Sequence, residues 1–235
     1  MLITVSERAE NSKNLTYIQN NISELLRQSS AVLNISTDDK RVTLNIDVPN
    51  YYYNFVKNEI AGYVCDVLTI FYKYSYIKKR IFTSGLSTKD NEILLTGIIS
   101  ADYETDKKYA LNLLGFLDTI AIDGVFNFKL KGLKEKWSEI ISVLPQSFSK
   151  EQLKEFIYYL QKDLTEKVFI ENNKLFSANF KETNRSTLIS DEFDLSKEIL
   201  LANAGKIVVL SGFENSCDEF LKIYYGDKVE FCKRV

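Results

Sequence analysis

The sequence predicts an α+β protein with an N-terminal β-α-β-β unit, a helical middle and a C-terminal α/β unit that contains a parallel strand pair. Three observations lead to this prediction. Apolar and polar residues alternate near both ends of the chain, which is typical of strands, and apolar residues recur every three or four positions between them, which is typical of helices. Near the C-terminal end, an unbroken apolar run, a helical pattern and a second short strand follow one another. That order favours a right-handed crossover between parallel strands.

The first 48 residues carry the β-α-β-β pattern. A short strand is expected over residues 2–5, and residues 15–26 have the apolar spacing of a helix. Residues 32–36 and 41–48 then alternate between apolar and polar side chains. The polar stretch between these two runs predicts a hairpin.

The middle of the chain is predicted to be helical. Apolar spacing predicts a long helix over residues 53–81, which Gly85 ends, and then two more helices before residue 118. Ser87 or Thr88 can cap the first of these two.

Residues 120–130 break the helical pattern. Their apolar side chains alternate with others, which predicts a strand or extended segment with a turn at Asp123-Gly124. An aspartate beside a glycine in a turn usually shapes the backbone, so we do not expect Asp123 to be a functional carboxylate.

The next part of the chain is expected to mix helices and a hairpin. One helix is predicted over residues 133–144, and a second helix begins at a capping box formed by Ser149 and Gln152. Asn172-Asn173 then fits a two-residue hairpin turn.

The last 45 residues predict the order helix, strand, helix, strand. Asp191 can cap the first helix and Gly205 can end it. Residues 207–210 fit a strand that is covered on both faces. Ser216 begins a second capping box, and residues 229–232 form the closing strand.

Composition argues against several classes of function. The chain has 235 residues, which fits one large or two small domains, and the patterns suggest a division into residues 1–118 and 119–235. The net charge of −2 argues against a non-specific nucleic-acid binder. No histidine is present, so a Ser-His-Asp triad, a Cys-His pair and a histidine-bearing zinc site are excluded. We therefore expect no catalytic residue, cofactor or metal of these kinds.

Cysteine use and hydropathy predict a cytoplasmic protein. The three cysteines form neither a disulfide framework nor a Cys-x-x-Cys site, which is typical of reduced thiols in a reducing compartment. The apolar start at residues 1–5 is too short for a signal peptide. The longest apolar run, residues 60–72, contains Asp66 and is well short of the ~20 residues that a membrane span needs.

One stretch of the chain reads Ile122-Asp123-Gly124-Val125-Phe126-Asn127-Phe128-Lys129-Leu130-Lys131. It resembles the Ile-Asp-Gly-hydrophobic-x-x-Phe-Arg-Leu-Lys signature of the YtxC-like sporulation proteins. Residues 154–160 are similar to the Glu-Phe-Ile-x-Leu-Leu helix of that family, and the last strand-helix-strand pattern also agrees. The residues that carry the match are Ile122, Asp123, Gly124, Phe126, Phe128, Lys129 and Phe156.

The resemblance is closest over residues 120–232. It implies a sporulation-associated protein from a spore-forming, Firmicutes-like bacterium. It implies no reaction, because no activity is assigned to the family.

The loop over residues 211–216 is the first candidate site. It follows the carboxyl end of a parallel strand and leads into a helix, which is where α/β sheets bind ligands and where free N–H groups favour anions. The loop has one glycine and no lysine, so a plain connection to a capped helix is the favoured interpretation. The candidate ligand-binding residues are Ser211, Gly212, Asn215 and Ser216.

The basic stretch over residues 72–80 is the second candidate. Its basic and aromatic side chains alternate, which would suit a nucleic acid or an acidic partner. The favoured interpretation is a helix with a solvated basic face and buried tyrosines. The basic residues are Lys73, Lys78, Lys79 and Arg80.

Three functions remain open on the sequence. The favoured one is a non-catalytic interaction or regulatory protein of the sporulation programme, which should bind another protein and expose an apolar or aromatic patch larger than a few hundred Å². The second is an enzyme that uses carboxylates or lysines in a cleft near the 211–216 loop. The third is weak nucleic-acid binding through the basic stretch.

Overall fold

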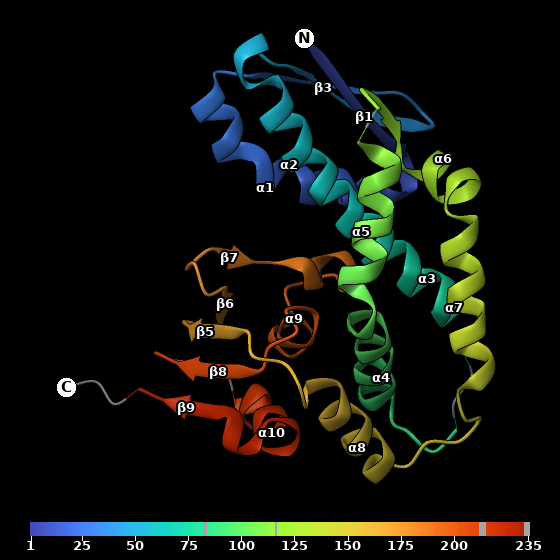
Figure 1. The fold of residues 1–235 in the computed structure, drawn as a ribbon, viewed down its shortest axis with the longest axis vertical. Helices are drawn as coiled ribbons and strands as arrows, with labels where there is room; N and C mark the ends of the chain where they lie inside the picture. The colour runs from blue at the N-terminus through green and yellow to red at the C-terminus, as the bar shows by residue number, and fades with distance from the viewer. Residues whose placement is uncertain (82–83, 116, 212–214, 233–235) are drawn as a thin grey trace. The chain divides into compact units, whose positions relative to one another are not determined.

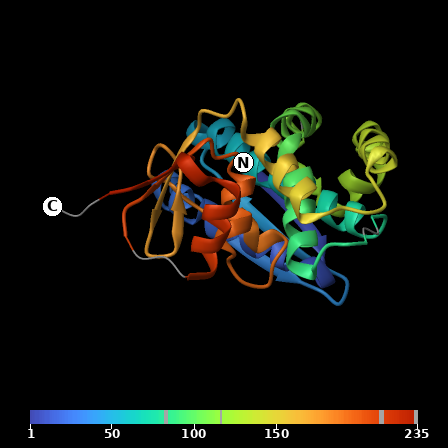
Figure 2. The same ribbon diagram turned by 90° about the horizontal axis from the view of Figure 1, so that it is seen from below.

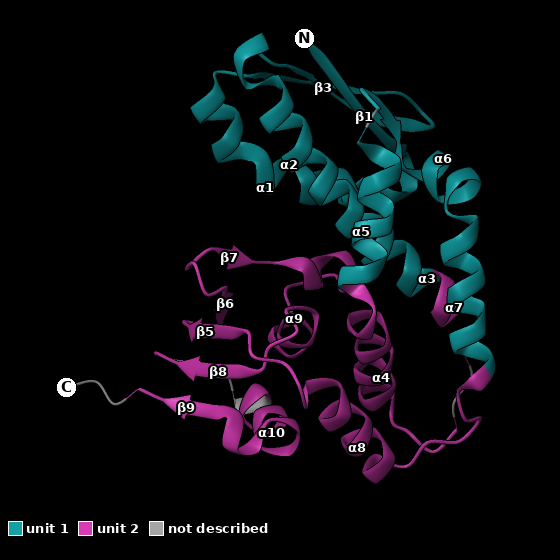
Figure 3. Cartoon of the chain, in the orientation of Figure 1, with its two compact units in different colours: residues 1–75, 104–142 teal, residues 76–103, 143–235 magenta. Residues whose placement is uncertain are grey.

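The computed structural model describes residues 1–81, 84–115, 117–211 and 215–232, and it is an α+β protein with two sheets (Figure 1). Its contacts divide the chain into two compact units (Figure 3). Unit 1 contains residues 1–75 and 104–142, and unit 2 contains residues 76–103 and 143–235. Each unit combines segments from both halves of the chain, so this division differs from one between residues 118 and 119.

Unit 1 begins with the predicted β-α-β-β unit. It consists of β1 (Leu2–Arg8), α1 (Lys13–Ser29), β2 (Val32–Thr37) and β3 (Arg41–Asp47). Both β1 and β2 pair antiparallel with β3, and every second side chain of β1 is buried, as are Leu44 and Ile46 of β3. A fourth strand, β4 (Thr119–Ala121), pairs parallel with β1 and completes the order β2-β3-β1-β4.

The segment after β4 differs from the prediction. It is helical, with α6 (Ile122–Gly124) followed by a π-helical turn, η4 (Val125–Lys129), and Gly124 has the right-handed helical angles φ −66° and ψ −44°. The expected turn at Asp123-Gly124 is therefore wrong. The alternating pattern misled because the buried apolar side chains of this segment are Ile122, Val125 and Leu130, which have helical spacing.

The predicted long helix is present and contains an unexpected π-helical segment. It runs through α2 (Tyr53–Asp66), η3 (Val67–Tyr72) and α3 (Lys73–Lys78), after a short 3₁₀ turn, η2 (Asn50–Tyr52). The helix ends at Lys78, before Gly85. Two more helices follow later in the chain, α5 (Tyr103–Leu114) and α7 (Lys131–Val143).

A buried ion pair lies among these helices. The Lys73 Nζ is 2.8 Å from the Asp106 Oδ2, and neither side chain is exposed. The same carboxylate accepts a hydrogen bond from the Trp137 indole at 2.8 Å and one from the Lys136 ammonium at 3.0 Å. Lys73 was expected on a solvated basic face, and this expectation is wrong because its charge is neutralised inside unit 1.

Unit 2 contains the second sheet, in the order β7-β6-β5-β8-β9. Its strands are β5 (Lys167–Glu171), β6 (Lys174–Phe176), β7 (Glu182–Thr183), β8 (Lys206–Val209) and β9 (Val229–Phe231). The predicted parallel pair is confirmed, since β8 pairs parallel with β9, and α10 (Asn215–Tyr224) connects them. β8 also pairs parallel with β5 on its other side. The strands can be followed from below in Figure 2.

The predicted hairpin of unit 2 is also confirmed. β5 and β6 pair antiparallel across Asn172-Asn173, and both turn residues have positive φ, at 49° and 60°. A turn with two positive φ values matches the twist of the strands beside it, and asparagine tolerates that conformation well.

The remaining helices of unit 2 begin at side-chain caps. They are α4 (Thr88–Ala101), α8 (Lys150–Gln161) and α9 (Leu195–Leu201). Ser87 caps α4, and Ser149 caps α8 in a complete capping box, as predicted. The cap of α9 is Asp194 rather than the predicted Asp191, because the chain between these two residues is still a loop.

Among the residues that the structure describes, each helix is too short or too polar to cross a lipid bilayer.

The buried ion pair leads to a stability prediction. Asp106→Asn removes the carboxylate that pairs with the buried Lys73 ammonium, so the unfolding free energy should fall by about 3–5 kcal/mol. Urea unfolding followed by tryptophan fluorescence measures this change, because Trp137 is the single tryptophan and bonds directly to Asp106. Lys131→Met is the control, since Lys131 is 85 % exposed in its pair with Glu135, and it should change the free energy by less than about 1 kcal/mol. Equal effects of the two variants would contradict the prediction.

Candidate functional site

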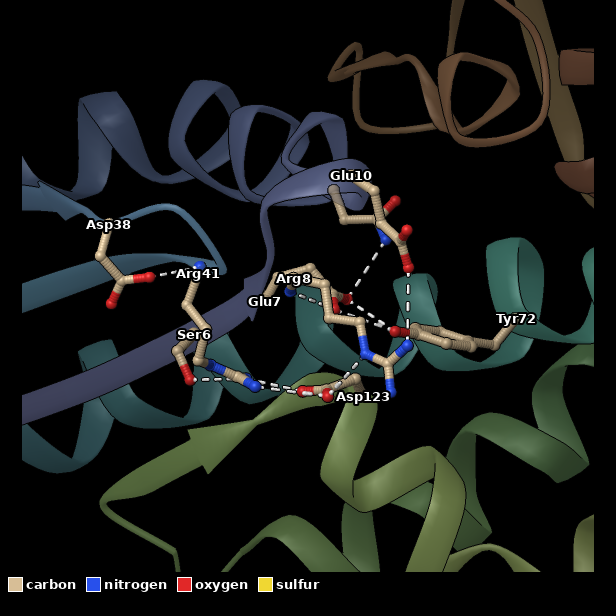
Figure 4. Close-up of polar contacts among 9 residues, drawn as sticks. Ser6, Glu7, Arg8, Glu10, Asp38, Arg41, Tyr72 and Asp123 are labelled. Atoms are coloured by element: carbon tan, nitrogen blue, oxygen red, sulfur yellow. Dashed lines mark hydrogen bonds and ion pairs between the residues drawn. The ribbon is translucent and has the colours of Figure 1, made fainter.

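A polar network, formed by Ser6, Glu7, Arg8, Arg41, Tyr72 and Asp123, lies at the end of β1 (Figure 4). Asp123 belongs to the family-like stretch, residues 122–131. The Arg41 guanidinium binds both carboxylate oxygens of Asp123, at 2.6 and 3.3 Å, and also donates to the Ser6 hydroxyl at 3.1 Å. The Arg8 Nε donates to the same carboxylate at 3.2 Å. Asp123 is therefore not a turn residue but the anion that joins β1, β3 and α6. The bidentate contact of Arg41 is of the kind that gives strong, orientation-specific hydrogen bonds, and Arg8 adds a single charge-assisted one.

The neighbouring carboxylate of Glu7 has a different environment. It is fully buried, and it accepts hydrogen bonds from the Tyr72 hydroxyl at 2.9 Å and from the Arg8 main chain at 2.8 Å. The Asn14 amide approaches it at 3.4 Å. Sequence reasoning missed this residue, because a glutamate that alternates with apolar residues in a strand gives no sign of which polar groups will surround it.

The two carboxylates have pKa values that are shifted in opposite directions. Hydrogen bonds from Arg41 hold the pKa of Asp123 below its ordinary value, against a smaller effect of burial. Burial raises the pKa of Glu7, and the hydrogen bonds from Arg8 and Tyr72 offset only part of that rise. Opposite shifts of this kind also occur in acid-base pairs of enzymes. Here each carboxylate is bonded to other groups of the fold, and neither lines the two hollows described below.

The first hollow belongs to unit 2 and has a volume of about 550 Å³. Asn173 lines it from the turn after β5, and Cys217 lines it from the first turn of α10, so it lies at the carboxyl ends of the parallel strands. This is the end of a parallel sheet at which α/β proteins bind ligands. The charged groups around it are Lys89, Asp191, Glu192 and Asp194.

The candidate loop at residues 211–216 is described only in part, because residues 212–214, and Gly212 with them, lie outside the described residues. The Ser211 hydroxyl donates to the Asn172 side chain at 3.2 Å, next to Asn173, which lines this hollow. Asn215 is the first residue of α10, and Ser216 therefore lies inside the helix rather than in front of it. That a ligand binds at this loop therefore stays a prediction.

A second hollow of about 420 Å³ lies between α4, α8 and α10. Its floor is apolar and includes Ile93 and Phe220. Its rim carries three lysines and three carboxylates, which are Lys89, Lys150, Lys154, Asp90, Glu151 and Glu219. Because the rim charges balance, they select neither an anionic nor a cationic ligand.

The basic stretch does not form one basic surface. Lys73 is fully buried, and the Lys78 ammonium bonds to Glu92 at 2.9 Å. Lys79 and Arg80 are exposed, and the Arg80 guanidinium lies over the Tyr76 ring at 3.7 Å. These contacts favour the interpretation of a helix whose basic side chains interact with nearby groups of the chain itself.

The cysteines are poorly suited to nucleophilic chemistry. Burial raises the pKa of the Cys65 thiol to about 12 and that of Cys217 to about 11, so both are protonated at neutral pH. Cys232 is exposed. Within the described residues, no group of three or more Cys, Asp or Glu side chains is arranged to hold a metal ion.

The family-like residues serve different structural roles. Ile122 is buried, Phe126 stacks on the Tyr72 ring at 4.4 Å, and Phe128 is 85 % exposed. Lys129 is exposed, and Phe156 makes an edge contact with Phe148 in unit 2. The stretch therefore combines core residues with one anion and an exposed ring, and it does not form a single pocket.

An exposed aromatic patch, formed by Tyr51, Tyr52 and Phe55, lies at the start of α2. The exposed fractions of these side chains are 88 %, 38 % and 57 %. The rings of Tyr51 and Tyr52 meet edge to face at 4.9 Å, and Phe55 follows one helical turn later. Sequence reasoning placed these residues at the beginning of a helix but missed the patch. Three consecutive tyrosines after a proline were the available signal.

Comparison with known proteins gave no match to a family model, a curated protein or a solved structure.

The polar network leads to a pH-dependent prediction. The folded-state pKa of Asp123 is lowered, so its ion pairs stabilise the fold above its unfolded-state pKa of about 4, and this contribution is lost as the pH falls through the lowered value. Asp123→Asn should lower the unfolding free energy at pH 7 by about 1–3 kcal/mol, and the difference from wild type should narrow below about pH 4.

Urea unfolding across this pH range measures the difference. Asp47→Asn is the control, because the carboxylate of Asp47 is 71 % exposed in its pair with the N-terminus, and its effect should be small at every pH. A difference between wild type and Asp123→Asn that is the same at pH 3 and pH 7 would argue against the ion pairs.

Proposed function

We propose that this protein is a non-catalytic, cytoplasmic interaction protein of a sporulation programme and that it binds another protein through the aromatic patch. The exposure of Tyr51, Tyr52 and Phe55 is the observation that carries the proposal. Aromatic side chains provide a large contact area at a low cost in conformational entropy, and they are enriched at the centres of protein interfaces.

The size of the patch supports this function. At ~150–250 Å² for each ring, the exposed fractions correspond to roughly 300–450 Å² of aromatic surface. This is the size of the largest apolar patch on a typical monomer, which is often functional. Keeping three rings in water is unfavourable, so a partner that covers them would gain hydrophobic free energy.

The bonding of the buried carboxylates within the fold supports a non-catalytic role. In the polar network, the carboxylate of Asp123 is occupied by two arginines, and that of Glu7 by Tyr72 and the main chain. A group that is to transfer a proton to a substrate needs an accessible atom near the reacting bond. These carboxylates instead hold strands and helices together.

The sporulation context rests on the resemblance of residues 122–131 to the YtxC-like signature. The two ion pairs of Asp123 give a structural reason for an aspartate at that position of the signature. Among the exposed members of the signature, Phe128 adds a further exposed aromatic ring to unit 1.

The hollow of about 550 Å³ in unit 2 favours a second candidate function, an enzyme or a small-molecule binder. Its place at the carboxyl ends of β5 and β8 and its ionisable groups are the supporting observations. Nucleic-acid binding through the basic stretch has weaker support, because Lys73 is buried and Lys78 is paired.

Site-specific photo-crosslinking tests the aromatic patch. A benzophenone amino acid at Phe55, introduced into the full chain in sporulating cells, should form a covalent adduct with one protein. The additional change Tyr51→Ser should reduce that adduct several-fold, because it removes the most exposed ring of the patch.

The control places the same photo-crosslinker at Tyr159. This ring is 73 % exposed and lies on α8, away from the patch in sequence. The same adducts from both positions, or no adduct from Phe55, would count against the proposed function.

The second candidate leads to its own prediction. A metabolite that binds the 550 Å³ hollow should raise the melting temperature of the full chain, and Lys89→Glu should reduce that rise because Lys89 lines the hollow. Lys154→Glu is the control, since Lys154 lines the second hollow, which Lys89 also lines, but not the 550 Å³ hollow. A rise that Lys89→Glu leaves unchanged would place the ligand elsewhere.

A further inference from the structure

β2 is an unusually open sheet edge. The described strands form four sheet edges, and three of them, β4, β7 and β9, are two or three residues long. β2 is six residues long, and it pairs with β3 without interruption from Val32 to Thr37.

The sequence of β2 lacks the usual protection of an edge strand. Natural edges are protected by charged residues, proline, bulges or short length. β2 reads Val-Leu-Asn-Ile-Ser-Thr, which contains neither a charge nor a proline, and its regular pairing with β3 leaves no bulge. Ile35 is 50 % exposed and Val32 is 56 % exposed. The short edges β7 and β9, by contrast, carry Glu182 and Glu230.

The alternation of hydrogen bonds shows which main-chain groups of β2 face outward. Asp38 N–H donates to the Arg41 carbonyl at 2.9 Å, so this residue pair belongs to the hydrogen-bonded type. Hydrogen-bonded and non-bonded pairs alternate along an antiparallel ladder. Val32, Asn34 and Ser36 therefore direct their main chain to β3. The residues that direct theirs to the open edge are Leu33, Ile35 and Thr37.

We propose that this edge pairs with β2 of a second copy of the chain, antiparallel and with Ile35 on the two-fold axis. In this register Ile35 faces its own copy, and Leu33 faces Thr37. The outward N–H and C=O groups of these residues would then all be satisfied across the axis. This register forms three hydrogen-bonded pairs across the axis, and each pair exchanges two bonds. The two four-stranded sheets then become one continuous sheet.

The side chains of β2 favour its own copy over a different chain. Ile35 pairs with Leu44 within the sheet and lies on the same face, so two copies would extend the apolar face across the axis. On the other face Asn34 would lie opposite Ser36, a polar pair. No like charges meet within the strand, and no charge is present that would select a partner of opposite sign. The small contact area predicts a weak dimer.

Disulfide trapping tests the register directly. Ile35 and its copy would have Cα atoms ~5.5 Å apart, which a disulfide can span, whereas Thr37 and its copy would be separated by four residues, or ~13 Å. In a full-length Cys232→Ser background, Ile35→Cys should give a covalent dimer under mild oxidation and Thr37→Cys should not. Equal trapping at both positions would overturn the proposal.

Charge exchange at the axis is the second test. Ile35→Lys and Ile35→Glu each place like charges opposite one another across the axis. For each variant alone, the dissociation constant of the dimer should rise at least tenfold, as measured by sedimentation velocity at high protein concentration. A one-to-one mixture of the two variants should restore the dimer. A monomeric wild type, or a mixture that stays monomeric, would overturn the proposal.

Tyr51→Ser separates this proposal from the proposed function. The aromatic patch lies on η2 and α2 rather than on β2, so this variant should leave the dimer unchanged. Loss of the dimer in Tyr51→Ser would mean that the patch, and not the strand edge, joins the two copies.

Discussion

Neutralisation of buried charge is the constraint on which unit 1 depends. The Lys73 ammonium is completely removed from water, and a buried ion costs several kcal/mol unless a counter-ion and further hydrogen bonds compensate. Asp106 provides that compensation while accepting from Trp137 and Lys136, so one carboxylate fixes side chains from α3, α5 and α7. A second buried carboxylate, that of Asp66, works similarly with Tyr17 and Lys107.

The polar network at the end of β1 extends the same principle to the sheet. Arg8 and Arg41 come from adjacent antiparallel strands, and Asp123 comes from the segment that follows the added strand β4. The ion pairs therefore hold a segment more than 100 positions away in the sequence against the first strand. These charges are bonded within the fold, and two apolar surface features of unit 1, the aromatic patch and the edge of β2, are candidates for recognition.

The local pattern of residues was a good guide to individual elements. The alternation in residues 32–36 and 41–48 predicted the hairpin, Asn172-Asn173 predicted the turn with positive φ, and the apolar run at 207–210 predicted a strand with parallel neighbours. These features are decided by neighbours in the sequence, by the period of apolar residues and by the conformational preferences of turn residues.

The contacts between distant segments could not be predicted in the same way. In the sequence, Lys73 resembles its exposed neighbours Lys78 and Lys79. Its burial is possible because the fold places the Asp106 carboxylate beside it. Asp123 precedes a glycine, so it resembles a turn residue, but its two arginines lie 115 and 82 positions away. The strand β4 was missed as a partner of β1 because three residues carry too little periodicity to identify their neighbour.

A ¹³C NMR titration of the carboxyl groups is the most direct test of whether unit 1 uses its charges to hold the fold together. The Asp123 resonance should titrate below the ordinary aspartate range because of its arginines, and the Glu7 resonance should titrate above the ordinary glutamate range because of burial. If both groups titrated at the ordinary values of exposed carboxyls, they would be solvated and free to react, and the account of these charges as internal ties would be wrong.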